Sequence, residues 1–270
     1  MNIVVVGECG PFNIHLIRTL HEHRPIGTLL RVVNRPGSTS SRLKKLRRAP
    51  FGTLVRFAER GLFYRPHRRR MKKELSRQLF GSSAPPRIDG VKQLDVPASD
   101  INSKATIELL QSLAPDVLIV SGAPLLSAAV YSIARLGAVN VHRGIAPAYR
   151  GDDSHFWSMY FGDYRGLGIT IHYLDEGIDT GPVLAQGFPA IDDGESEVTM
   201  LAKCSQTAAE LLLEFLDVAQ RKPSGRSLNG ASRLFRIRDR RIWHDARLSF
   251  CQNVLRHRIP TRPCSKTVYF

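Results

Sequence analysis

The chain has few cysteines and no long apolar runs. Its four cysteines, Cys9, Cys204, Cys251 and Cys264, are scattered and form no Cys-x-x-Cys pair. This spacing predicts neither a disulfide framework nor a zinc module and is typical of a reducing compartment, so we expect a cytoplasmic protein. No segment is apolar for long enough to cross a bilayer, and the first apolar run lacks the basic lead and cleavage site of a secretory signal.

Acidic residues are also scarce. The 270 residues include 24 Asp and Glu against 39 Lys and Arg, which gives a formal net charge of +15. Such a chain attracts phosphate, anionic lipid or an acidic small molecule, and the total charge does not distinguish among them. Because 43% of the residues are hydrophobic, the chain can bury a full core and is not a disordered tail.

Short β-branched runs alternate with helical patterns along most of the chain. This alternation predicts an α/β protein with an open, mostly parallel, Rossmann-like sheet and helices on both faces. The expected strands are residues 3–6, 29–33, 91–96, 115–122, 138–142, 169–174 and 182–188. The expected helices are residues 12–23, 101–113 (capped by Ser99 or Asp100), 151–162 (with Asp152 or Asp153 capping its N-terminus) and 196–218 (capped by Ser196). We expect one domain over residues 1–221 and a short C-terminal extension over residues 222–270, whose role the pattern does not indicate.

A basic insertion interrupts the alternation at about residues 41–80. Residues 42–77 hold fourteen Lys and Arg but only Glu59 and Glu74 as acids, and apolar residues recur there at helical spacing: Phe51, Leu54, Val55, Ala58 and Leu62. The pattern predicts an amphipathic helix flanked by arginines. It could bind tRNA, a nucleotide-linked substrate or an anionic membrane surface; alternatively, it packs one face on the core and leaves the arginines in solvent.

Three polar residues suggest chemistry. Asn140 and His142 fall on one face at the end of an expected strand, and Asp179 lies in a glycine-bounded turn. An amide, an imidazole and a carboxylate together suit acyl transfer, which needs a stabilised oxyanion and a group that removes a proton from the nucleophile. Two other histidines have structural interpretations, His155 as a helix-surface residue and His172 as a hydrogen-bonded core residue.

The segments around these residues resemble the folate-dependent formyltransferases. They are Asn140-Val141-His142, Pro147-Ala148-Tyr149-Arg150-Gly151 and the run from Gly168 to Gly181, in the order and spacing of that family. The resemblance implies 10-formyltetrahydrofolate as formyl donor, no metal, Asn140 and His142 as oxyanion donors, and Asp179 as the group that orients His142 and takes the amine proton. It places the folate beside Gly122, Leu125, Leu126, Leu174, Asp175, Glu176, Gly177 and Ile178, although Leu126 could instead plug the core. It places the acceptor near Gly10, Arg143, Tyr149 and Arg150.

The chain departs from the family at one point that bears on the acceptor. Most members continue Asn-x-His with Pro-Ser-Leu-Leu-Pro, whereas Arg143 to Ala146 precede Pro147 here. Arg143 could bind a phosphate or carboxylate of the acceptor or form a structural salt bridge. We expect an N-formyltransferase acting on a small-molecule amine, such as a nucleotide-linked amino sugar. The alternatives are a methionyl-tRNA formyltransferase, for which the tail after Lys222 looks short, a formyltetrahydrofolate hydrolase, and an inactive binding protein of the same fold; the oligomeric state stays open.

Overall fold

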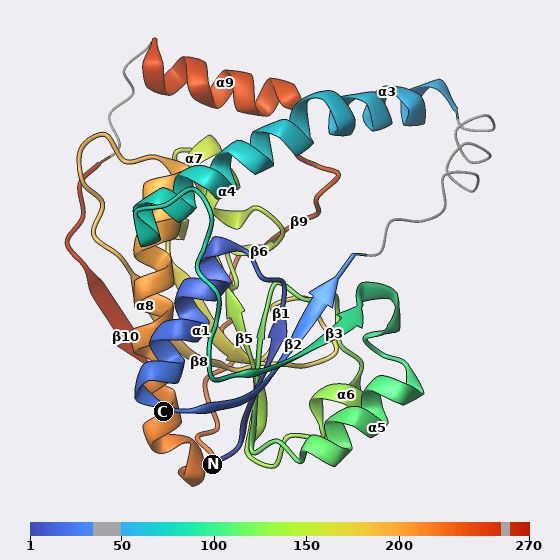
Figure 1. Ribbon diagram of the computed structural model, residues 1–270. Helices are drawn as coiled ribbons and strands as arrows, with labels where there is room; N and C mark the ends of the chain where they lie inside the picture. The colour runs from blue at the N-terminus through green and yellow to red at the C-terminus, as the bar shows by residue number, and fades with distance from the viewer. Residues whose placement is uncertain (35–49, 255–259) are drawn as a thin grey trace.

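The computed structural model describes residues 1–34, 50–254 and 260–270, and within them a single large sheet organises the chain (Figure 1). Its eight strands lie in the order β10-β8-β7-β5-β4-β1-β2-β3, and only β7 and β10 run against the other six. The predicted open, mostly parallel α/β sheet is therefore confirmed. The strands are β1 (Ile3–Gly7), β2 (Ile26–Val33), β3 (Lys92–Pro97), β4 (Val117–Ser121), β5 (Gly137–His142), β7 (Ile169–Tyr173), β8 (Val183–Phe188) and β10 (Ser265–Val268).

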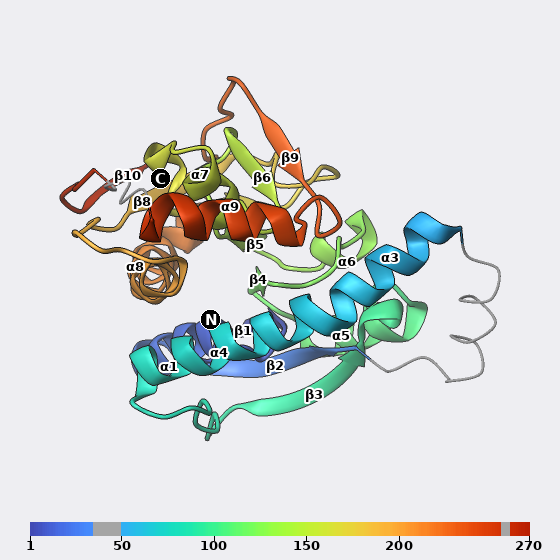
Figure 2. The same cartoon turned by 90° about the horizontal axis from the view of Figure 1, so that it is seen from above.

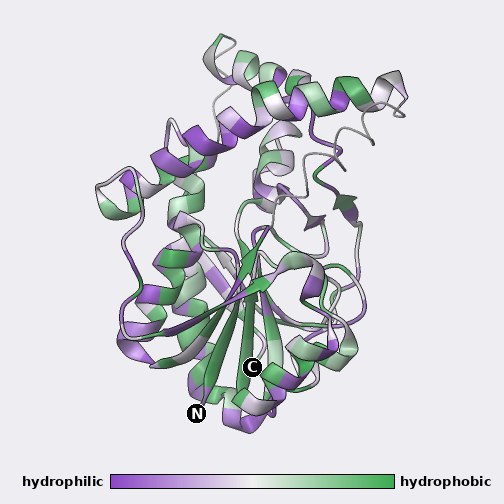
Figure 3. Cartoon of the chain, turned by 45° about the vertical axis from the view of Figure 1, so that its right-hand side comes forward, coloured by the Kyte–Doolittle hydropathy of each residue, from purple (hydrophilic) through white to green (hydrophobic). Residues whose placement is uncertain are grey.

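Helices cover both faces of this sheet, and alternation along the strands divides the core between them. Ile3 and Val5 of β1 pack with helices α1 (Pro11–His23) and α8 (Glu197–Val218), while Val4 and Val6 pack on the other face with α5 (Lys104–Leu113) and α6 (Ala128–Tyr131). In Figure 3 the strands form the green centre between these layers. No helix of the described ranges is long and apolar enough to cross a membrane.

Helix ends follow the predicted caps only in part. Ser196 caps α8 in a reciprocal pair with Thr199, as expected. The cap of α5 is Ser103, which accepts from the Thr106 N–H, so the prediction of Ser99 or Asp100 is wrong. Both predicted residues belong to a preceding 3₁₀ turn, Ala98–Asp100, whose hydrogen bonding ends before the helix begins.

The basic insertion forms a long helical rod above the carboxyl edge of the sheet (Figures 1 and 2). Helix α3 (Phe51–Glu59), a π-helical turn at Arg60–Tyr64 and α4 (Arg65–Phe80) follow one another without a break. Only the end of α4 packs on the core, through Leu75 and its neighbours. In α3, Leu54, Val55 and Phe57 are exposed, with Val55 at 42%, and Leu62 in the next turn is 70% exposed. The alternative in which one face of the insertion packs on the core while its arginines stay in solvent therefore holds for the end of α4 and fails for these residues of α3. The basic residues Arg42, Lys44, Lys45, Arg47 and Arg48 lie outside the described residues.

The C-terminal extension returns to the main sheet. Its first strand, β9 (Arg233–Phe235), pairs with β6 (Tyr149–Gly151) next to α7 (Ser154–Tyr160); α9 (Ile242–Asn253) follows, and β10 then pairs antiparallel with β8. The residues after 221 thus cover both the outer edge of the sheet and the loop that follows β5.

Arg240 fixes this extension to the rest of the protein. Its guanidinium lies over the Phe156 ring, 3.6 Å from the ring centre, and bonds to Glu197 and Asp245. The side chain is only 4% exposed, so these carboxylates replace its water. Burial lowers the pKa of Arg240, but the surrounding carboxylates outweigh burial and hold the pKa above its ordinary value, so the charge is retained.

Replacing Arg240 by alanine should therefore lower the free energy of unfolding by about 3 kcal/mol, because its buried ion pairs with two partly buried carboxylates are lost. Urea unfolding followed by circular dichroism measures this loss. Arg238→Ala is the matched control, because Arg238 is exposed and has no ion-pair partner among the described residues. Equal stabilities of the two variants would show that Arg240 does not hold the extension in place.

Candidate functional site

The candidate site lies where β5 ends, and Asp179 is its centre. The carboxylate is 10% exposed, and each of its oxygens meets two groups. Oδ1 accepts from the Asn140 amide at 3.0 Å and lies 3.4 Å from His172 Nε2. Oδ2 accepts from the Gly151 N–H at 2.7 Å and lies 3.2 Å from His142 Nδ1. The structure thus brings together the three residues that the sequence singled out, with two more.

The turn that carries Asp179 is shaped by its own residues. Asp175 accepts from the Gly177 N–H at 3.0 Å and from the Thr180 hydroxyl at 2.8 Å. A Cβ on Gly177 would lie 1.9 Å from that hydroxyl oxygen, so only glycine fits. Asp179 itself has φ of 51°, in the left-handed region that is unfavourable for most residues. Asp175 was expected near the folate, and its carboxylate stabilises the turn through these hydrogen bonds.

The charges in the site favour an ionised carboxylate beside a neutral imidazole. Burial raises the pKa of Asp179, but His142, His172 and the Gly151 N–H outweigh it and leave the pKa well below its ordinary range. Burial also lowers the pKa of His142, against the opposing effect of the Asp179 carboxylate. At neutral pH the pair therefore carries one negative charge.

Both ring nitrogens of His142 face oxygen acceptors. Its Nε2 lies 2.7 Å from the Tyr149 carbonyl oxygen and its Nδ1 faces Asp179, so both ring nitrogens point at oxygen acceptors. A neutral ring has one N–H and can serve only one of them, whereas the protonated ring serves both. A Cβ on Gly144 would lie 2.8 Å from Nε2, so the loop that departs from the family pattern wraps closely around this histidine.

His172 is the polar member that the sequence analysis missed. It is buried and donates from Nδ1 to the Tyr173 carbonyl oxygen, 2.7 Å away, as expected of a core histidine. Its Nε2, however, lies 3.1 Å from the Asn140 amide nitrogen. In the antiparallel pairing of β5 with β7, His172 is opposite Asn140. The side-chain alternation along residues 169–174 could have pointed to His172. It identifies a site residue only when the pairing of β5 with β7 is known.

The residues expected near the folate differ in exposure. Leu125 and Ile178 are 54% and 37% exposed and could contact a flat ring system, whereas Leu126 fills the core at 2% exposure. Leu174 is partly buried on that core cluster. Gly122 follows β4 and packs against Glu8, and Glu176 is exposed in the turn. Within this set, Leu125 and Ile178 therefore offer exposed apolar surface. The described residues include no cluster of three His, Cys, Asp or Glu placed to hold a metal.

The four residues expected near the acceptor have different surroundings. Gly10 lies beside Lys72 of α4, and the Arg143 guanidinium lies over the Phe12 ring, 5.5 Å from its centre. Tyr149 gives its carbonyl to the site, while its ring is buried and its hydroxyl donates to Asp163. The buried Nε of Arg150 has no hydrogen-bond partner in the described structure. Arg150 precedes Gly151, whose N–H binds Asp179, in β6.

The expectations around α7 are confirmed only in part. His155 is buried, so its expected place on the helix surface is wrong; its Nε2 lies 3.1 Å from the Cys204 sulfur, and burial lowers its pKa to about 3. Asp153 is the N-cap residue of α7, as expected, but its side chain forms no hydrogen bond with the helix backbone. Asp152 instead accepts a hydrogen bond from the Ile237 N–H of the C-terminal extension. Asp153 forms an ion pair with Arg68 of the basic helix at 2.9 Å.

Comparisons with known proteins agree with this geometry. The profile of the formyl transferase family matches residues 1–216. The chain belongs to this family. A methionyl-tRNA formyltransferase from Syntrophus aciditrophicus is 31% identical over 162 residues, which are 58% of the chain and 52% of that protein. The chain spans between about a third and about half of the length of the first curated relatives that it matches.

Solved structures show the same fold at low identity. A sugar N-formyltransferase from a Shewanella species superposes with a TM-score of 0.54 at 14% identity, over 88% of this chain and 78% of the other. The formyltransferase PseJ from Anoxybacillus kamchatkensis, solved with UDP-4,6-dideoxy-4-formamido-L-AltNAc and tetrahydrofolate, superposes with a TM-score of 0.50 at 14% identity, over 96% of each chain. The formyltransferase fold expected from the sequence is confirmed.

The charge coupling in the site can be measured directly. We expect the pKa of His142 to lie below its ordinary value and to fall further in Asp179→Asn, because the carboxylate favours the protonated ring. Proton NMR titration of the His142 ring measures both values. Asp217→Asn is the control, since Asp217 is an exposed carboxylate at the end of α8 that pairs with Arg24 rather than with His142. An unchanged or higher midpoint in Asp179→Asn would contradict the coupling.

Proposed function

We propose that this formyl transferase family member moves the formyl group of 10-formyltetrahydrofolate to a primary amine of a small, anionic acceptor. The observation that carries the proposal is the convergence of Asn140, His142 and Asp179 at the end of β5. The bound folate would supply an activated formyl carbon, and the exposed Leu125 and Ile178 would hold it. The protein then has to stabilise negative charge on the formyl oxygen and remove a proton from the amine.

The side chains can divide these tasks. The amide nitrogen of Asn140 lies within hydrogen-bond distance of both His172 and Asp179. As negative charge develops on the formyl oxygen, the amide N–H of Asn140 that faces His172 can turn to donate to that oxygen instead. Asp179 is the acceptor for the amine proton. His142 can take this proton from Asp179 through Nδ1, because its Nε2–H then already donates to the Tyr149 carbonyl oxygen and the new N–H at Nδ1 faces the Asp179 carboxylate. His172 acts as a positioning residue through Asn140.

An anionic acceptor fits the positive groups around the site. The unsatisfied Nε of Arg150 lies one residue from Gly151, which binds Asp179. Guanidinium groups recognise phosphate and carboxylate through paired hydrogen bonds, so a buried unpaired donor here favours an acidic partner over a neutral amine. A nucleotide-linked amino sugar, the unformylated counterpart of the UDP-formamido sugar bound to PseJ, combines the amine with a diphosphate.

Removing the amide of Asn140 should slow the reaction without unfolding the protein. Asn140→Ala should lower kcat by roughly 10²–10³, the usual loss for one oxyanion donor. Mass spectrometry of a panel of amines incubated with 10-formyltetrahydrofolate measures the transfer. Gln111→Ala, which removes an exposed amide on α5, should keep full activity. Formate release without an amine would indicate a hydrolase instead, and equal activity of both variants would remove Asn140 from the mechanism.

Methionyl-tRNA is the second candidate acceptor. The curated relatives are methionyl-tRNA formyltransferases at 31–37% identity, and the exposed basic helix α3–α4 could contact phosphates. The small-molecule proposal predicts no formylmethionyl-tRNA when the chain is incubated with charged initiator tRNA. Formation of that product, with tRNA binding that weakens steeply as salt rises, would favour the second candidate.

A further inference from the structure

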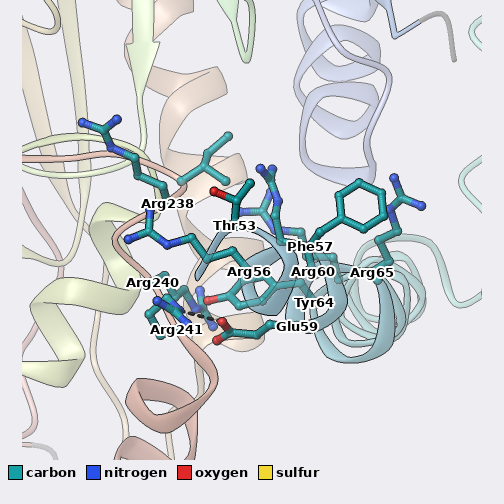
Figure 4. A pocket seen from close by; sticks show the side chains of 13 residues that line it. Thr53, Arg56, Phe57, Glu59, Arg60, Tyr64, Arg65, Arg238, Arg240 and Arg241 are labelled. Carbon is teal, nitrogen blue, oxygen red and sulfur yellow. Dashed lines mark hydrogen bonds and ion pairs between the residues drawn. The ribbon is translucent and has the colours of Figure 1, made fainter. Parts of the chain in front are cut away.

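A pocket separate from the catalytic residues lies between the basic helix and the C-terminal extension. Figure 4 shows its two walls, one formed by α3 and the turns that follow it and the other by residues 237–241, with arginine side chains from both. Its volume is about 550 Å³, within the range of small-molecule sites. Seven arginines and a single acid, Glu59, line it.

Only some of these arginines are neutralised. Arg240 pairs with Glu197 and Asp245, and Arg241 pairs with Glu59 at 2.6 Å. Arg56, Arg60, Arg65 and Arg238 also line the pocket, and no carboxylate of the described residues lies within ion-pair distance of them. All four are exposed. Four uncompensated guanidinium groups around one hollow repel one another, and a multiply charged anion would remove this repulsion.

The pocket is connected to the catalytic carboxylate through residues 151–153. Arg68 lines the pocket and bonds to Asp153, and the lining residue Ile237 donates to Asp152. Gly151 in turn donates to Asp179. Because two residues of chain span at most about 7 Å, the pocket wall lies close to the catalytic turn. A ligand held in the pocket can therefore extend an attached group towards Asp179.

We propose that this pocket binds the diphosphate of an organic ligand. Guanidinium groups bind phosphate oxygens in pairs, and arginines on two facing walls can hold two adjoining phosphates. The partly exposed Phe57 and Ile237 add apolar surface for the group beyond the diphosphate. That this ligand is the acceptor of the formyl group rests on the proposed function, whereas the diphosphate site itself does not.

Calorimetry of the full chain with inorganic pyrophosphate, at fixed ionic strength, tests the site. We expect one pyrophosphate per chain, and binding weaker by at least about tenfold in Arg56→Gln/Arg238→Gln, which removes one unpaired charge from each wall. The matched control is Arg69→Gln/Arg70→Gln, which removes the same charge from exposed positions of α4 that do not line the pocket. No pyrophosphate binding, or an equal loss in both double variants, would overturn the proposal.

Two further titrations identify the carrier of the diphosphate. Tighter binding of UDP than of pyrophosphate indicates a nucleotide, and tighter binding of farnesyl diphosphate indicates an isoprenoid lipid; both results support the site. In the formyl transfer assay, Arg56→Gln/Arg238→Gln should raise the KM for a diphosphate-linked amine and leave the KM for the folate unchanged. If pyrophosphate binds but no diphosphate-linked amine is formylated, the proposed acceptor fails and the site stands.

Discussion

The structure depends on one buried negative charge. An ionised carboxylate inside a protein is costly unless its oxygens are satisfied, and Asp179 is satisfied by groups from three separate strands. Asn140 and His142 come from β5, Gly151 from β6 and His172 from β7. The turn after β7 holds Asp179 in a left-handed conformation, which costs on the order of 1 kcal/mol. Movement of any of these elements would remove part of this set of partners.

The same charge explains why the site is preorganised for proton transfer. His142 is kept neutral by burial, yet its two nitrogens already face acceptors. The groups that a protonated ring needs are therefore in place before any proton arrives. Reorganisation of water around a new charge, which slows proton transfer in solution, is largely avoided.

Much of the fold and the centre of the site could be predicted from the sequence, because both depend on alternation along strands. The alternation put Asn140 and His142 on one face, and the glycines around Asp179 marked a turn. His172 was missed as a site residue because its approach to Asn140 depends on which strands are neighbours, and local pattern does not give that. The exposure of the apolar face of α3 could not be predicted either, because helical periodicity identifies an apolar face but not what covers it.

The place of β10 has a consequence for how the protein is made. β8 bonds to β7 on one side and to residues 265–268 on the other, which are synthesised long after it. At roughly 5–20 residues per second, several seconds pass on the ribosome before the second partner emerges. During that time the backbone amides along one side of β8 have no strand to pair with, and an unpaired strand edge is open to association with other chains. Nascent chains of this protein are therefore open to such association from the synthesis of β8 until residues 265–268 have emerged.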